Sequence, residues 1–413
     1  MVEYHPHMEE VLDDPYPVYR RLRDEAPAYW VESYNAWALS RFADQWEVSQ
    51  DNEHLTAREG TTPHYLVSQA IPALPNLNHM DPPAHRVLRS ALLPFFLPRR
   101  VGRVEAELRP VVRACIDAFL ERGQADAVRE IGQGVASRLA SMAIGFPPGD
   151  SVYIVDLVKR FLSREPGIDG ITPTGVAAFE EMQRYLASVA RGRRAHRGEP
   201  ENPIDVLIRA EVEGERLDDL VIGQHLILLL VGATETFPKA FASAVHRLWQ
   251  HPEQRRELAA RPEWIPLALR ECLRYDMPTQ FAMRKVVAEL EVGGKRLRPG
   301  QLVMFLWPSG NRDEREFPDP DRFDIQRNPH RVLFFGNGTH RCLGAHFALM
   351  EGRILLEELL ARAADYEVDL AGAERERGEL FRGFSRLPIH AGPARPRGAA
   401  PSAGAADVRG PGA

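Results

Sequence analysis

Phe335-Gly-Asn-Gly-Thr-His-Arg-Cys342-Leu-Gly344 is the stretch that decides the fold of this 413-residue chain. It places one cysteine in a glycine-rich loop directly before a helix-forming run, Ala345-His-Phe-Ala-Leu-Met-Glu351. The positive end of a helix dipole and the free N–H groups of the first turn favour an anion. The sequence therefore predicts a lowered pKa for the Cys342 thiol and a role for it as a thiolate.

Glycines set the shape of this loop. Gly336 and Gly338 permit positive φ, which lets the backbone curl under the sulfur, and Gly344 lets a flat group approach the start of the helix. From the residues alone, an inert buried cysteine remains open, and so does a zinc site that uses His340 and His346. No second cysteine lies at the spacing of a zinc finger, and the C-x-x-C-H pattern of covalently attached haem is absent.

The same ten residues resemble the haem-ligating signature of the cytochrome P-450 family, F-x-x-G-x-[H/R]-x-C-x-G, and match each of its fixed positions. The resemblance implies that Cys342 is the anionic axial ligand, and the metal ligand, of haem b (iron protoporphyrin IX), with Phe335, Gly336 and Gly344 around it. It implies a mainly α fold, a helical prism with a small β-rich lobe. The haem would lie between a long central helix and the helix after the cysteine loop.

A second segment, His79-Met-Asp-Pro-Pro-Ala-His85-Arg-Val-Leu-Arg89, is similar to the D-P-P-x-H-x-x-x-R segment of the family. The i, i+4 spacing puts His85 and Arg89 on one side of a helix. The resemblance implies that these two residues, together with Arg284 and His340, bind the haem propionates, which are anions that need such partners.

A charge triad is implied by two further motifs. Glu271-Cys-Leu-Arg274 places Glu271 and Arg274 on one helix face, and Phe317-Pro-Asp-Pro-Asp-Arg322-Phe supplies another arginine. By resemblance to the family, Glu271, Arg274 and Arg322 form a buried structural lock behind the haem.

The long helical pattern over 218–250 contains Leu228-Leu-Leu-Val-Gly232-Ala-Thr-Glu235-Thr236, which is similar to the oxygen-activating stretch of the family. In that case Gly232 lies against the haem, Thr236 holds dioxygen and a water, and Glu235 feeds protons inward. The residues alone also allow a plain core helix whose threonine hydroxyl bonds to its own preceding turn. Pro238 cannot donate a backbone N–H. We therefore expect a distorted turn from Gly232 to Thr236, with the Thr234 or Ala233 carbonyl bonded to water or to the Thr236 hydroxyl.

The remaining elements follow from periodicity and turn residues. Helical patterns occur at 14–23, 101–122, 177–191, 218–250, 266–275 and 345–364, and strand patterns at 29–39 and 302–306. Loops are expected at 60–80, 145–175 and 307–341. We expect one domain over 1–390 and a disordered Ala-, Gly- and Pro-rich tail over 391–413.

Composition narrows the class of protein. With 44% hydrophobic and 27% charged residues the chain has the profile of a globular protein, and its net charge of −6 argues against a nucleic-acid partner. Three scattered cysteines fit a reducing cytoplasm rather than a disulfide framework. The first residues have neither a basic nor an apolar region of a signal peptide, so we expect no membrane anchor.

The function implied by the resemblance is that of a soluble bacterial-type, haem-thiolate monooxygenase. It would activate dioxygen with electrons from a separate ferredoxin or flavodoxin and its reductase, and hydroxylate a medium-sized hydrophobic molecule in secondary metabolism or catabolism. A docking surface for the electron donor is expected at Arg99, Arg100, Arg103 and Arg341. A monomer is expected. By family position, the substrate pocket would comprise Tyr65, Leu66, Ile71, Leu228, Val231, Gln280, Phe281, Met283, Phe384 and Ser385.

Two other classes remain open. One is a haem-thiolate oxidase that couples aromatic rings or a peroxygenase driven by peroxide, although the Glu235-Thr236 pair is intact. The other is a non-catalytic haem protein, either a sensor or a docking module for a carrier protein.

Overall fold

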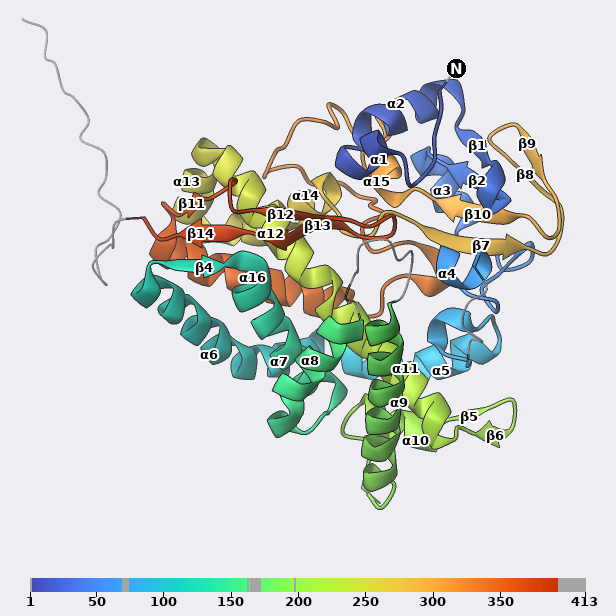
Figure 1. Ribbon diagram of the computed structural model, residues 1–413, viewed down its shortest axis with the longest axis horizontal. Coiled ribbons are helices and arrows are strands. Elements are labelled where there is room, and N and C mark those ends of the chain that lie inside the picture. The colour runs from blue at the N-terminus through green and yellow to red at the C-terminus, as the bar shows by residue number, and fades with distance from the viewer. Residues whose placement is uncertain (1, 69–73, 162, 164–171, 197, 393–413) are drawn as a thin grey trace, which may run out of the picture.

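A computed structural model describes residues 2–68, 74–161, 163, 172–196 and 198–392 (Figure 1). Residues 393–413 of the predicted tail and Ile71 lie outside the described residues. The α-helices are α1 Glu9–Asp13, α2 Tyr16–Glu25, α3 Phe42–Val48, α4 Pro63–Leu66, α5 Ala84–Leu92, α6 Pro98–Arg122, α7 Gln133–Ile144, α8 Ser151–Phe161, α9 Pro173–Arg193, α10 Pro203–Arg209, α11 Asp219–Thr234, α12 Thr236–Gln250, α13 Pro252–Ala260, α14 Ile265–Tyr275, α15 Trp307–Gly310 and α16 Ala345–Ala363.

The strands form one larger sheet and several small ones. The five-stranded sheet has the order β1 Ala28–Val31, β2 Ala36–Leu39, β10 Leu302–Phe305, β7 Ala282–Val286, β3 Leu55–Thr56. A three-stranded sheet has the order β11 Glu367–Val368, β14 Pro388–His390, β4 Gln124–Asp126. The hairpins are β5 Glu211–Val212 with β6 Glu215–Arg216, β8 Leu290–Val292 with β9 Lys295–Leu297, and β12 Glu374–Arg377 with β13 Arg382–Arg386.

Two hydrophobic cores divide the molecule unequally. The larger one joins the long helices α6, α11, α12, α14 and α16, while the smaller one lies between α1, α2 and one face of the five-stranded sheet. Figure 1 shows the blue N-terminal elements and the sheet at one side and the helices filling the rest. The expected mainly helical architecture with a small β-rich lobe is confirmed.

The central helix is broken where the proline-containing sequence predicts distortion. Helix α11 ends at Thr234 and α12 begins at Thr236, with Glu235 in a turn between them. A π-helical turn, Ala127–Gly132, packs against α12 at this point. A Cβ at Gly132 would lie 2.9 Å from the Cα of Pro238, so only glycine allows the two backbones to approach this closely.

Taken together, 219–250 is the only helical stretch in the described parts of the chain that is long and apolar enough to cross a membrane, and its most apolar 18-residue window has a mean hydropathy of 1.6. It runs through the larger core, and core helices commonly pass the same test. The expected loops are wrong in part: the segment 145–175 contains α8 and the beginning of α9, and the segments 60–80 and 307–341 contain the short helices α4 and α15.

Candidate active site

The cysteine loop is held closed by backbone hydrogen bonds. The Cys342 N–H donates to the Phe335 carbonyl at 2.8 Å, and the Gly336 N–H donates to the Leu333 carbonyl at 2.8 Å. Gly336 and Gly338 have φ of 64° and 71°, as the sequence predicts. The Cys342 side chain stays exposed, so its sulfur borders open space at the start of α16.

The expected low pKa of Cys342 is wrong for the protein alone. Desolvation raises the pKa of this thiol, and the opposing influences of the Gly344 N–H, Arg89 and Arg341 are weaker. A cation bound at the sulfur would favour the thiolate over the thiol.

The residues predicted to bind propionates come together beside this loop. The His85 and His340 rings lie 4.4 Å apart between centroids, and Arg89 donates to the Arg341 carbonyl. Burial and the Arg89 and Arg284 charges lower the pKa of His85 to about 4, and burial with Arg284 and His85 lowers that of His340 to about 2. Both ring nitrogens of His85 and Nδ1 of His340 are buried without a hydrogen-bond partner.

Arg284 completes this group of cationic and donor side chains. Burial lowers its pKa to about 10, with only the Asp81 charge opposing, and its guanidinium donates to its neighbour's carbonyl. His79 was not predicted to belong here, yet it is near enough to lower the pKa of His340, and its buried Nδ1 also lacks a partner. Among the described residues, Asp81 is the acidic side chain whose charge favours the cationic forms of His85 and Arg284, and buried donors without partners are costly unless a ligand accepts from them.

The predicted charge triad is correct in two of its three members. Arg274 binds Glu271 through two hydrogen bonds of 2.6 and 2.8 Å, and both side chains are fully buried. The third member is not Arg322, which is exposed, but Arg327, whose Nε lies 3.3 Å from Glu271 Oε1. The loop turns at Asp319, with φ of 47°, and sends the later arginine inward.

Two threonine hydroxyls are bonded within the helix interruption. Thr234 Oγ1 donates to the Leu230 carbonyl at 2.8 Å, and Thr236 Oγ1 donates to the Gly232 carbonyl at 3.0 Å. The predicted distortion is confirmed, but the acceptor of the Thr236 hydroxyl is neither Ala233 nor Thr234. A Cβ at Gly232 would meet no atom within 4 Å, so the helix faces open space there.

Part of the predicted substrate pocket lies on the partly exposed side of α11 and in α4. Leu228 and Val231 are only half-buried although they sit in the middle of a core helix. In α4, Leu66 packs at the edge of the smaller core, and the Tyr65 ring lies 4.6 Å from that of His79.

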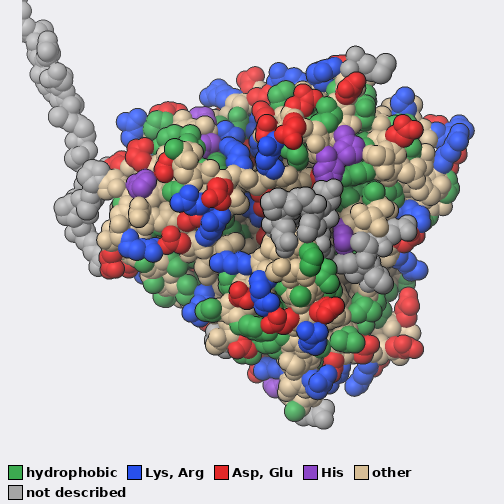
Figure 2. Space-filling model, viewed as in Figure 1, with side chains coloured by type: hydrophobic (Ala, Val, Ile, Leu, Met, Phe, Trp, Pro, Cys, Tyr) green, Lys and Arg blue, Asp and Glu red, His purple; other side chains and the backbone are tan. Residues whose placement is uncertain are grey.

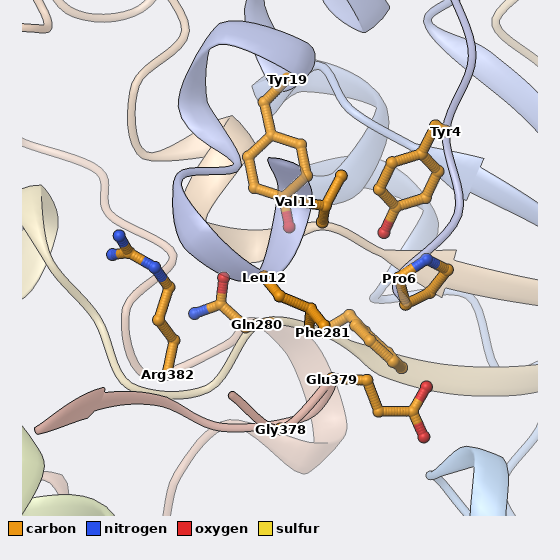
Figure 3. A pocket seen from close by; sticks show the side chains of 10 residues that line it. All are labelled: Tyr4, Pro6, Val11, Leu12, Tyr19, Gln280, Phe281, Gly378, Glu379 and Arg382. Carbon is orange, nitrogen blue, oxygen red and sulfur yellow. The ribbon is translucent and has the colours of Figure 1, made fainter. Parts of the chain in front are cut away.

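Three residues predicted to line the pocket, Gln280, Phe281 and Met283, lie in or just before β7 and face away from the side chains expected to bind the haem. Successive side chains of a strand point to opposite faces, so Met283 cannot share the side of Arg284. Phe281 and Met283 are fully buried in the smaller core, whereas Ala282 packs against the larger one. Gln280 is buried too, and it lines a small cavity with Tyr4, Tyr19 and Phe281 beneath α1 and α2 (Figure 3). These residues support the N-terminal lobe.

Two more residues predicted to line the pocket, Phe384 and Ser385, lie elsewhere, in strand β13 of the hairpin β12–β13. The Phe384 ring packs against His246 at 5.1 Å, three turns beyond Thr236, and the Ser385 carbonyl accepts from Arg129. The residues that lie next to the 278–282 segment are Leu380 and Phe381 of the hairpin turn. The sequence predicts Phe384 at this position. The exact register of a hairpin is not visible in a short apolar pattern.

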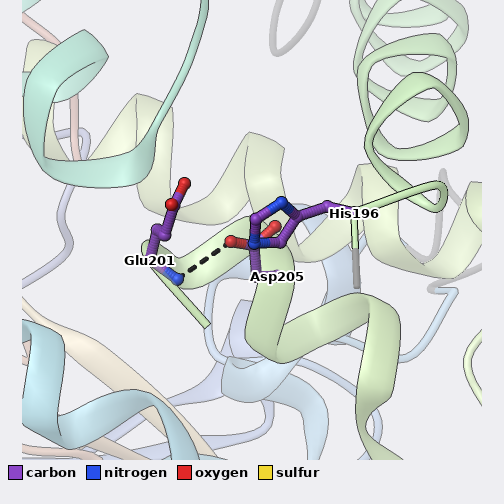
Figure 4. Close-up of side chains that lie close together, drawn as sticks. All are labelled: His196, Glu201 and Asp205. Atoms are coloured by element: carbon purple, nitrogen blue, oxygen red, sulfur yellow. Dashed lines mark hydrogen bonds between the residues drawn. The ribbon is translucent and has the colours of Figure 1, made fainter. Parts of the chain in front are cut away.

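One further cluster has the side chains of a metal site. His196, Glu201 and Asp205 lie close together at the start of α10 (Figure 4). Arg193 binds Asp205 at 2.8 Å and also pairs with Glu201, so both carboxylates already have a cationic partner. The cluster is an ion-pair network that fixes α10 against α9.

Comparison with known proteins agrees with this geometry. The family model described as Cytochrome P450 matches residues 265–377. The chain is 36% identical to cytochrome P450 123 of Mycobacterium tuberculosis over 387 residues, which is 93% of this chain and 96% of the relative. It is 32% identical to the steroid C26-monooxygenase of the same species over 335 residues, covering 79% and 88% of the two chains. The solved structure of CalO2 superposes with a TM-score of 0.84 at 27% identity over 95% of this chain and 100% of that one.

The chain therefore belongs to the cytochrome P450 family, the haem-thiolate monooxygenases. The residues present fit such a cofactor. A haem brings two carboxylates, and the buried, unpartnered nitrogens of His85 and His340 beside Arg89 and Arg284 are suited to receive them. A Cβ at Gly344 would meet nothing within 4 Å, which leaves room for a flat group next to Cys342.

Proposed function

We propose that Cys342 is the axial thiolate of haem b in a monooxygenase that inserts one oxygen atom into a medium-sized hydrophobic molecule. The observation that carries this proposal is the group His85, Arg89, Arg284 and His340 beside the cysteine loop, in which buried histidine nitrogens have no hydrogen-bond partner within the described structure. When bound, the cofactor supplies reductive activation of dioxygen, which the thiolate favours by donating electron density.

In this proposal the interruption of the central helix supplies the polar groups. The Thr236 hydroxyl lies on the open side of the break, and it can exchange its bond to the Gly232 carbonyl for one to dioxygen or water. Glu235, which directly precedes Thr236 and is buried, delivers protons to that hydroxyl. Leu228 and Val231 contact the substrate and exclude water from the reacting atoms.

The substrate class rests on the apolar character of the open side of α11. Leu228, Leu229 and Val231 are half-buried there, so a hydrophobic molecule gains stabilisation by covering them. The relative named steroid C26-monooxygenase supports a substrate of that size and polarity.

The electron donor is proposed to be an acidic ferredoxin or flavodoxin. Arg99, Arg100 and Arg103, in the first turns of α6, line an open hollow of about 670 Å³, and Arg341 lies directly before Cys342. A positive surface on a chain of net charge −6 steers an acidic partner toward the cysteine side. We propose that residues 1–390 act as one domain, as a monomer in the cytoplasm.

The experiment is the spectrum of the reduced protein with carbon monoxide. A thiolate ligand gives the red-shifted Soret band of the family, and Cys342→Ala is expected to lose that band. Cys115→Ser is the matched control, because Cys115 is half-buried in α6. An unchanged band in Cys342→Ala would refute the ligand assignment, and turnover with peroxide but not with dioxygen and ferredoxin would refute the monooxygenase proposal.

A further inference from the structure

A buried lysine contacts the residue proposed to deliver protons. Lys239 lies in the first turn of α12, and its ammonium binds the Glu235 carboxylate and lies 3.3 Å from the Glu235 carbonyl oxygen. The same ammonium lies 3.1 Å from Glu376 Oε2, which comes from strand β12. The side chains of Lys239, Glu235 and Glu376 are 7%, 8% and 18% exposed.

The protein is shaped around this lysine. At Gly383 of β13, a Cβ would lie 2.9 Å from Lys239 Cβ and 3.4 Å from its Cγ, so the hairpin closes on the lysine stem. The Phe381 ring covers the ammonium at 5.9 Å. Burying three charges costs free energy that an apolar core would not, and the three together carry a net charge of −1.

The exposed fractions of the three side chains order them from the solvent to the interior. Glu376 is the member that reaches solvent, Lys239 bridges, and Glu235 ends beside Thr236 in the helix interruption. Neither Lys239 nor Glu376 belongs to the motifs from which the function was predicted.

We propose that Lys239 and Glu376 form the solvent side of the proton path and hand protons to Glu235. This inference rests on the proposed function of Glu235. The ammonium of Lys239 gives a proton to the Glu235 carboxylate, which leaves a neutral amine and a carboxylic acid. The amine recovers a proton from protonated Glu376, and Glu376 recovers one from water. No electrons move, and each proton that leaves Glu235 is replaced from solvent.

The first test needs no turnover. Lys239→Met removes the cation that the two carboxylates share, and one of them is then expected to be protonated at neutral pH. The infrared difference spectrum between the variant and the wild type should gain a protonated-carboxyl band that shifts in D2O. The band should disappear when both carboxylates are replaced as well, in Lys239→Met combined with Glu376→Gln and Glu235→Gln. Its absence from Lys239→Met would overturn the shared-proton arrangement.

The second test measures proton delivery in the haem-loaded enzyme. Glu376→Gln is expected to slow turnover on the order of 10-fold and to raise the solvent isotope effect, with haem content and substrate affinity unchanged. Glu374→Gln is the matched control, since Glu374 lies on the same strand in an exposed 2.7 Å pair with Arg129. It should behave like the wild type.

The outcomes separate this inference from the proposed function. If the wild type shows the thiolate spectrum and oxidises substrate with dioxygen, the proposed function holds whatever these variants do. Turnover and isotope effect in Glu376→Gln within twofold of the wild type would then overturn the proton path alone. Since Glu376 is the most exposed of the three side chains, this variant also decides the question if Lys239→Met does not fold.

Discussion

The assignment of Arg327 rather than Arg322 to the buried charge group predicts very different costs for two similar substitutions. Arg327 is 13% exposed and lies 3.3 Å from Glu271, and it donates to the carbonyls of Pro318, Asp319 and Arg322 at 2.7, 3.0 and 3.1 Å. Arg322 is exposed, and no side-chain hydrogen bond or ion pair of it is recorded in the described structure.

The magnitude for Arg327→Met follows from these contacts. A hydrogen bond from a charged donor contributes about 1.5–3 kcal/mol, and bonds that share one side chain do not add. Glu271 stays neutralised by Arg274, so the loss should be below the roughly 3–5 kcal/mol of breaking a buried pair. We expect the free energy of unfolding to fall by about 2–4 kcal/mol in Arg327→Met and by less than about 0.5 kcal/mol in Arg322→Met.

Urea unfolding of the haem-loaded protein, followed by circular dichroism, measures both. The midpoint should drop for Arg327→Met with the slope unchanged, because only stability and not compactness is altered. Equal midpoints for the two variants, or a larger loss in Arg322→Met, would refute the placement of the loop.

Two further predictions concern the helix interruption and buried histidines. Thr236→Ala should leave haem reduction and substrate affinity intact but lower the coupling, which is the amount of product formed per nicotinamide consumed. Glu235→Gln should slow turnover without that loss of coupling. Equal coupling in Thr236→Ala and the wild type would contradict the role of the hydroxyl. Burial lowers the pKa of His225 and of His246 to about 4. Since the unfolded chain binds protons at these histidines near pH 6.5, stability should fall as pH drops from about 6.5 toward 4, by up to ~2 kcal/mol per histidine at pH 5. Urea midpoints measured from pH 7 to 5 check this, and His225→Gln should weaken the dependence.

The sequence predicted what is determined by neighbours along the chain. The cysteine loop needs glycines at fixed positions, and the helix interruption follows from a proline that cannot donate a hydrogen bond. The pKa of Cys342 was predicted wrongly because the dipole of α16 is local, whereas the desolvation that outweighs it comes from the rest of the molecule.

Other predictions failed for different reasons. The alternation of strand β7 should have excluded Met283 from the side of Arg284, and that signal was present in the sequence. Arg322 and Arg327 both follow the same loop, and which one turns inward depends on the path of the backbone at Asp319. The pairing of Lys239 with Glu376 joins a helix to a strand far along the chain, and no local pattern predicts it.

Because Gly132 packs closely against Pro238, these two positions differ in which amino acids they can accept. The nearest atom to a Cβ at position 132 is the Cα of residue 238, which every amino acid has. Replacing the proline therefore creates no room for a larger residue at 132, while position 238 can change as long as glycine stays opposite. A library that varies both sites should thus recover many residues at 238 and only glycine at 132, a one-directional epistasis that comes from backbone proximity.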